Sequence, residues 1–254
     1  MAQRAALRVG LRRLALLSSS VRRHSRQRLT LVAKEKDMRI YAVNGSPRKK
    51  WNTATVLQSA LDGAASAGAE NVRTEMIHLY DYSYTGCVSC FQCKRKGGKH
   101  YGRCAVRDGL TPVLEKCREA DGIIFGSPVY FHNITGMMRS FLERLLFPCI
   151  AYDRDYSSLA LKKPATAFIY TMNVTREVML EQHYPEKLRS TEFFIERSFS
   201  RPGVLYVNDT YQFSDYSKYV VECFSEQDKA RRRETQFPLD CRKAFELGRD
   251  LARA

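Results

Sequence analysis

The 254-residue chain lacks the sequence patterns of several common enzyme classes. No G-x-G-x-x-G run is present, so the fingerprint of a dinucleotide-binding βαβ unit is missing. No Ser/His/Asp triad or pair of carboxylates can be recognised, and the five histidines are widely separated along the chain. These absences leave nucleophilic and general acid–base hydrolysis without candidate residues.

Acidic residues are also absent before Glu35, and residues 1–37 carry +8 of the net charge of +15. An Arg-rich, Ser-containing segment without acidic residues is typical of an organellar transit peptide. Its apolar stretch at residues 14–17 is too short to span a membrane. We favour a start at Met38, where the first strand is predicted, over a transit peptide. Residues 1–37 are then a basic, disordered leader outside the fold.

Residues 38–254 carry the other +7, dispersed along the chain. Nucleic-acid binding would need a basic stripe in the folded part, and only residues 94–103 and 231–233 concentrate basic side chains. We therefore expect no specific nucleic-acid partner. The chain contains eight cysteines and no secretory signal, which indicates a reducing, cytoplasmic location.

Strands and helices are predicted to alternate from Met38 onwards. Strands are expected at residues 38–44, 72–79, 121–126, 164–172 and 204–207. Helices are expected at residues 53–67, 110–119, 136–147 and 239–252. The alternation predicts one α/β domain over residues 38–254, a doubly wound, five-stranded parallel sheet of order 2-1-3-4-5 with helices on both faces and a C-terminal helical extension.

The segment at residues 173–235 is less clear than the rest of the domain. It is rich in charge and in aromatic side chains: Tyr206, Tyr211, Phe213, Tyr216 and Tyr219. Amphipathic rings favour interfaces, so these residues either cover a ligand or subunit contact or pack the last helices. We favour packing.

Residues 45–53 form a polar loop between the first predicted strand and the first predicted helix. Its candidate binding residues supply hydroxyl, guanidinium and amide groups, with no acidic residue between them: Ser46, Arg48, Asn52 and Thr53. Asn52 or Thr53 is expected to cap the helix, and free amides at a helix N-terminus favour an anion such as phosphate. An ordinary capped turn with solvated basic side chains is the alternative.

Residues 127–136 form a second Gly/Pro-punctuated loop, after the buried strand at 121–126. Its candidates combine an apolar wall with one amide: Pro128, Val129, Tyr130, Phe131 and Asn133. Core packing is the alternative role of the two aromatic side chains. Because ligands bind at the carboxyl ends of the strands in an open parallel sheet, the two loops are expected to form the two halves of one site.

In combination, GSPRKKWNT (45–53) and GSPVYFHNITG (126–136) resemble the NADPH-dependent FMN reductase family of flavodoxin-like proteins, most of all its iron-sulfur flavoprotein branch. The resemblance covers residues 38–150. It implies that the first loop wraps the phosphate of FMN through its four candidate residues. It implies that the second loop lines the isoalloxazine ring and ribityl chain through its five candidates. It also implies a homodimer or homotetramer, in which a neighbouring subunit completes the flavin site.

A long loop predicted at residues 80–109 holds half of the cysteines: Cys87, Cys90, Cys93 and Cys104. Successive C-x2-C intervals suit an iron-sulfur cluster better than zinc, which usually takes two separated pairs. The resemblance implies a [4Fe-4S] cluster on these four residues, although the fourth lies further from the third than the compact motif prefers. A metal-free, redox-sensitive loop is the alternative. Neighbouring Lys and Arg are expected to lower the thiol pKa values.

The other four cysteines are scattered among apolar neighbours and are expected to be buried as small hydrophobic residues: Cys117, Cys149, Cys223 and Cys241.

The resemblance implies an FMN-dependent oxidoreductase that transfers electrons from NAD(P)H through flavin to a quinone, a flavin or another small-molecule acceptor. The alternative is an electron carrier with FMN and a [4Fe-4S] cluster, which accepts electrons from a redox protein such as ferredoxin. A third hypothesis is a zinc- or nucleic-acid-binding module, which leaves both ligand loops unexplained. No residue is assigned a catalytic role, because the cofactor carries the reaction.

Overall fold

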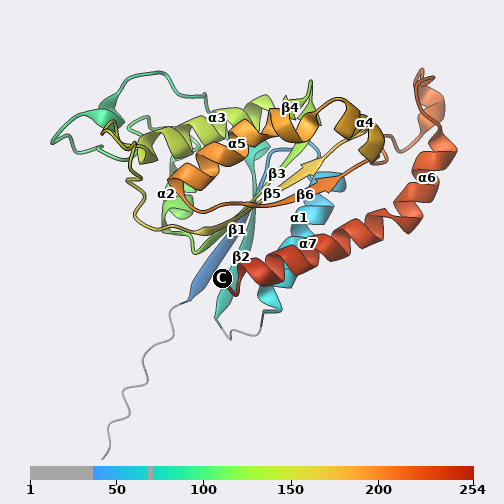
Figure 1. Cartoon of the computed structure of the whole chain (residues 1–254), viewed down its shortest axis with the longest axis horizontal. Coiled ribbons are helices and arrows are strands. Elements are labelled where there is room, and N and C mark those ends of the chain that lie inside the picture. The colour runs from blue at the N-terminus through green and yellow to red at the C-terminus, as the bar shows by residue number, and fades with distance from the viewer. Residues whose placement is uncertain (1–36, 68–70) are drawn as a thin grey trace, which may run out of the picture. The chain divides into compact units, whose positions relative to one another are not determined.

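A computed structural model describes residues 37–67 and 71–254, and Figure 1 shows their arrangement. The expected leader at residues 1–37 lies outside these ranges except for Asp37. Within the ranges described, no helix combines the length and the apolar character that crossing a bilayer requires.

Five parallel strands form the sheet: β1 (Met38–Asn44), β2 (Val72–His78), β3 (Gly122–Tyr130), β5 (Ala165–Thr171) and β6 (Gly203–Val207). Their order is β2-β1-β3-β5-β6, which confirms the predicted order when these five strands are numbered along the chain. A two-residue strand that was not predicted, β4 (Asn133–Ile134), pairs antiparallel with the end of β3. β3 therefore stays extended past its predicted end at Gly126, because its last residues pair with β5 and then with β4.

Helices cover both faces of the sheet, as predicted (Figure 1). One core contains side chains of α1 (Asn52–Ala65) and α7 (Phe237–Leu251), and the other contains those of α2 (Thr111–Glu119), α3 (Gly136–Leu146) and α5 (Tyr184–Ser198). The alternation along β1 assigns its residues to the two faces: Ile40 and Ala42 pack with α1 and α7, whereas Tyr41 and Val43 belong to the opposite core.

Residues 173–235 contain α4 (Arg176–Glu181), α5, β6 and α6 (Glu226–Thr235), of which only β6 was predicted. Their aromatic side chains pack on one another. The ring of the buried Tyr216 lies 4.8 Å from that of Tyr211 and 5.1 Å from that of Phe213, and Tyr206 stacks on Tyr170 in β5. Short 3₁₀ turns also occur in the domain, at Leu79–Asp81, Gln92–Lys94, Phe147–Cys149 and Tyr216–Lys218.

α1 and α7 approach each other backbone to backbone. A Cβ atom added at Gly63 would lie 1.9 Å from the carbonyl oxygen of Phe245, and one added at Gly248 would lie 1.8 Å from that of Ala60. Both positions therefore exclude any side chain, and this contact fixes α1 and α7 side by side on one face of the sheet.

We expect Gly248→Ala to lower the free energy of unfolding by about 3 kcal/mol, because the new methyl group must push two packed helices apart. Gly136→Ala is the matched control, since a Cβ atom there meets nothing within 4 Å. Urea denaturation of both variants measures the difference. An equal effect in the two variants would contradict the proposed close contact.

Candidate functional site

The first loop leaves β1 through two consecutive side-chain turns. Oδ1 of Asn44 accepts a hydrogen bond from the amide of Ser46 (2.9 Å), and Oγ of Ser46 accepts one from the amide of Arg48 (3.2 Å). The predicted helix cap is wrong. Trp51 is the N-cap residue and makes no side-chain cap bond in the described structure, while Asn52 and Thr53 lie inside the first turn. The amides at the start of α1 thus keep their capacity to bind an anion.

The side chains of Asn52 and Thr53 are buried and bonded to protein partners. Nδ2 of Asn52 donates to the carbonyl of Tyr211 (2.8 Å), and its Oδ1 accepts from Arg233 (2.7 Å). Oγ1 of Thr53 lies 2.7 Å from Oγ1 of Thr171, at the end of β5. These two residues therefore connect α1 to the end of β5, to the segment after β6 and to Arg233.

Arg48 lies on the same side of the loop. Its guanidinium donates to the carbonyl of Gln212 and lies 5.4 Å from the ring of Trp51, whose Nε1 donates to the carbonyl of Tyr211 (3.1 Å). The segment after β6 thus forms one wall of the first loop. The sequence analysis named Tyr211 as a residue that could cover a ligand but favoured packing, and it gave Arg233 no role in the site. Thr171 could have been assigned to the site, because it lies near the carboxyl end of a predicted strand.

The predicted second loop is in fact the end of β3 followed by a tight hairpin, which was not expected. Pro128 and Val129 lie in β3, and Tyr130 pairs with Asn133 across the turn. Phe131 (φ 49°) and His132 (φ 64°) adopt left-handed conformations, which a two-residue hairpin turn of this kind requires. The side chain of Phe131 is fully exposed and that of Tyr130 is half-exposed, so core packing is wrong for both.

The first loop is joined to β3 at the point where β1 ends. The amide of Gly45 donates to the carbonyl of Gly126 (2.8 Å), one residue beyond the last pair of the β1–β3 ladder. Oγ1 of Thr135 donates to the carbonyl of Gly45 (2.8 Å) and also caps α3. The structure thus brings the predicted residues of both loops to one edge of the sheet, as expected for a single site.

All four loop cysteines line one small cavity: Cys87, Cys90, Cys93 and Cys104. The volume of about 20 Å³ is roughly that needed for one water molecule, so a larger group would require the thiols to move apart. In the described residues, no three His, Cys, Asp or Glu side chains are arranged to hold a single metal ion. A cluster differs from a single ion because it places each cysteine on a different iron.

The charges around this cavity differ from the prediction. Lys94 donates to the carbonyls of Phe147 and Ile150, and burial raises the pKa of Cys93 despite the nearby Lys94. The cation that lines the cavity is Arg144 of α3. Its Nε is buried and has no hydrogen-bond partner among the described residues. Four thiols and a buried cation are a donor set suited to an anionic iron-sulfur cluster.

The remaining cysteines divide into two kinds. Cys117 and Cys149 are buried, as predicted, and burial raises their pKa values to about 12 and about 11. Cys241 is partly exposed, and Cys223 is exposed, so the prediction of burial is wrong for Cys223.

Residues 38–184 match the family model described as NADPH-dependent FMN reductase. The chain is 36% identical over 107 residues to an iron-sulfur flavoprotein of Methanocaldococcus jannaschii, covering 42% of this chain and 51% of that protein. It is 37% identical over 107 residues to an iron-sulfur flavoprotein of Archaeoglobus fulgidus, covering 42% and 48%. The match thus spans about half the length of these curated relatives.

A solved structure shows the same fold: the NAD(P)H:quinone oxidoreductase of Methanothermobacter marburgensis. It superposes with a TM-score of 0.60 at 14% identity, over 85% of this chain and 100% of that one.

Arg144 carries a fully buried charge that depends on Asp108. Its NH1 and NH2 groups bind the two carboxylate oxygens at 2.5 and 3.0 Å, and they also donate to the carbonyls of Thr85 and Val106. We expect Asp108→Ala to lower the free energy of unfolding by about 3 kcal/mol, because it leaves the buried guanidinium without a counter-charge. Thermal or urea unfolding measures this. Lys218→Ala, which removes an exposed ion pair, should change little.

His78, at the end of β2, should make stability depend on pH. Burial lowers its pKa, with Asp81 opposing and Lys49 reinforcing the shift, and its Nδ1 lies 3.0 Å from Nδ2 of Asn44. The folded state therefore favours the neutral ring. As pH falls below the usual value of about 6.5, the unfolded chain takes up the proton first, and stability decreases.

We expect the urea midpoint of unfolding to decrease when the pH is lowered from 7 to 5. The decrease should be smaller in His78→Gln. His183→Asn, which changes an exposed histidine, should show the same decrease of the urea midpoint as the wild type. Equal slopes in the wild type and His78→Gln would exclude His78 as the source.

Proposed function

Because the chain belongs to the NADPH-dependent FMN reductase family, we propose that it is an FMN-dependent oxidoreductase. It transfers electrons from NAD(P)H through the flavin to a quinone, a flavin or another small acceptor. One observation supports this proposal: the Gly45–Gly126 bond joins the loop that leads to the uncapped end of α1 to the strand that leads to the hairpin of β3 and β4. An anion-binding end next to an apolar wall matches the phosphate and the ring of FMN.

Different residues of the site would bind the two ends of the cofactor. The amides at the start of α1, with Arg48 and Ser46, would hold the phosphate, while Asn52 and Thr53 fix the position of that helix end. Pro128, Val129, Tyr130, Phe131 and Asn133 would hold the ring and the ribityl chain. When bound, FMN supplies the capacity to accept a hydride and to release one or two electrons.

The cysteine cavity favours a second candidate function. Cys87, Cys90, Cys93 and Cys104 would hold a [4Fe-4S] cluster, with Arg144 offsetting its negative charge. The chain would then be an iron-sulfur flavoprotein that carries electrons from a redox protein such as ferredoxin, with FMN as its second redox group. The observation behind this candidate is that all four thiols line one cavity although ten residues lie between the third and the fourth.

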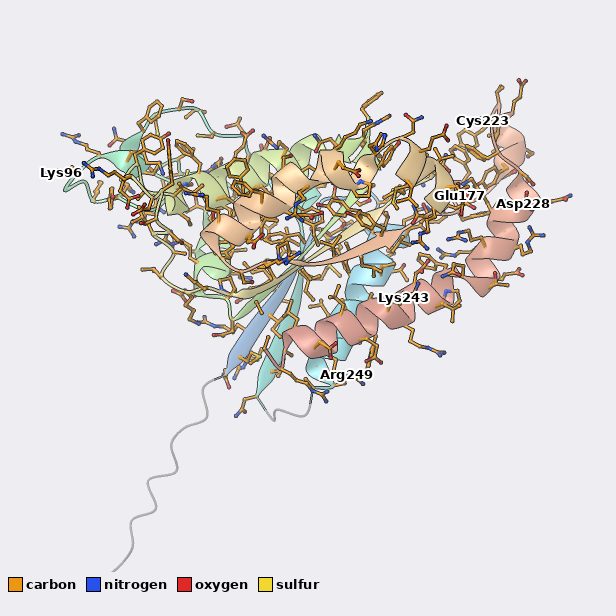
Figure 2. The ribbon with its side chains drawn as sticks, in the orientation of Figure 1. Lys96, Glu177, Cys223, Asp228, Lys243 and Arg249 are labelled. Atoms are coloured by element: carbon orange, nitrogen blue, oxygen red, sulfur yellow. The ribbon has the colours of Figure 1, made fainter. Side chains whose placement is uncertain are left out.

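The fully exposed Phe131 supports a homodimer or homotetramer, in which a neighbouring subunit covers the ring and completes the flavin site. All eight thiols are free, which supports a reducing, cytoplasmic location. The basic segments at residues 94–103 and 231–233 lie far apart in Figure 2, where Lys96 and Asp228 mark opposite ends of the view. This separation supports a protein without a specific nucleic-acid partner.

The test is anaerobic purification of the full chain, followed by its visible spectrum, its FMN and iron contents, and addition of NADPH. We expect bound or reconstituted FMN, with flavin bands that NADPH bleaches. Stoichiometric iron, with slow bleaching by NADPH and fast bleaching by reduced ferredoxin, would favour the carrier. A protein that takes up no FMN would contradict both functions.

Cysteine variants separate the two candidates further. Cys104→Ser should abolish iron binding if a cluster is present and leave FMN binding intact. Cys223→Ser is the matched control, because Cys223 is exposed and does not line the cavity. Equal iron contents in the two variants would exclude the assigned ligand set.

A further inference from the structure

α6 lies outside residues 38–184, which match the family model, yet it is fixed to the edge of the sheet that carries the flavin loops. The anchor is Lys229, which is 1% exposed. Its Nζ binds the carboxylate of Asp209 (2.6 Å) and the carbonyl of Asn173 (3.0 Å), in the segments that follow β6 and β5. Arg232 adds a bond to the carbonyl of Asn208 (3.3 Å). α6 therefore holds a defined position at this edge.

From this position Arg233 reaches the first flavin loop. Its NH1 donates to Oδ1 of Asn52 (2.7 Å), and its guanidinium lies 4.2 Å from the ring centre of Phe237. The amide nitrogen of Asn52 is in turn bound to the carbonyl of Tyr211, so both polar atoms of this side chain are fixed. Arg233 thus determines the orientation of the first residue of α1.

The charge of Arg233 has no carboxylate partner in the part of the chain that the structure describes. Its neighbours on the helix differ: Arg231 pairs with Asp228 (2.7 Å), and Arg232 lies 3.8 Å from Asp209. The first turn of α1 contains no acidic residue, and Arg48 lies on the same loop. An uncompensated guanidinium therefore stands beside free helix amides, which is an arrangement that favours a doubly charged anion.

We propose that Arg233 is a positioning residue for the phosphate group of FMN. It holds Asn52 and the start of α1 in the conformation that presents the helix amides, and its charge raises the local potential for the phosphate. The assignment rests on the proposed function, because it takes the anion at this helix end to be the phosphate of the flavin. It makes FMN affinity depend on a helix beyond the region that defines the family.

The test compares Arg233→Gln and Arg231→Gln in the full chain, by titrating the apoprotein with FMN and with riboflavin while recording flavin fluorescence. Riboflavin lacks the phosphate. We expect Arg233→Gln to weaken FMN binding about tenfold and to leave riboflavin binding unchanged, because only the phosphate senses the lost contact. Arg231→Gln, whose arginine is exposed and paired with Asp228, should change neither.

Two further measurements keep the assignment falsifiable. Arg233→Lys should recover part of the FMN affinity, since it keeps the charge without the planar fork. The decrease of FMN affinity with rising salt should be shallower in Arg233→Gln than in the wild type. Equal losses of FMN and riboflavin binding, or an unchanged FMN affinity, would overturn the assignment and leave the proposed function intact. A wild-type chain that binds no FMN would overturn both.

Discussion

The hydrogen bond between the amide of Gly45 and the carbonyl of Gly126 is the constraint on which the candidate site depends. It continues the β1–β3 ladder by one step, so that the first loop leaves the sheet beside β3, which itself continues into the hairpin. Neither position tolerates a side chain. A Cβ atom at Gly45 would lie 2.9 Å from Cβ of Met138, and one at Gly126 would lie 2.6 Å from Cδ1 of Leu57. The two glycines thus let α1 and α3 approach the sheet closely at the point where the loops begin.

Two buried cationic side chains hold the loops at this edge of the sheet and around the cysteine cavity. Lys229 fixes the segments after β5 and β6 through Asp209, and Arg144 fixes the cysteine loop through Asp108 and two backbone carbonyls. Removing such charges from water is costly, and each is offset by a carboxylate and by further hydrogen bonds. Irregular loops have few backbone hydrogen bonds of their own. A buried charged side chain that bonds to several groups of a loop therefore holds the loop in one conformation. Apolar packing alone would define that conformation less well.

The sheet order was predictable because apolar strands that alternate with helices leave few arrangements once crossovers are right-handed. The convergence of the first and second loops followed from that order. The contact between Arg233 and Asn52 did not, because no local pattern links residues so far apart in the chain. The helix cap was mispredicted for a related reason: Asn52, a good capping residue, is held inside the helix by tertiary partners at both of its polar atoms.

The hairpin shows most directly how tertiary contacts override local preference. Left-handed conformations at Phe131 and His132 are unfavourable for bulky side chains, and turn-forming residues such as Asn or Gly are absent from the two positions. The turn keeps this conformation because contacts with α5 hold it in place. The ring of His132 packs 4.7 Å from that of Tyr184, and its Nδ1 lies 2.7 Å from Nζ of Lys187, both on α5.

The consequence is that Phe131 is held outward, at full exposure, by contacts made on the other side of the turn. The left-handed backbone of the turn carries this ring on the outside of the hairpin. Strain and exposure at one position, next to the end of β3, are the combination expected where a cofactor or a neighbouring subunit supplies the missing apolar partner.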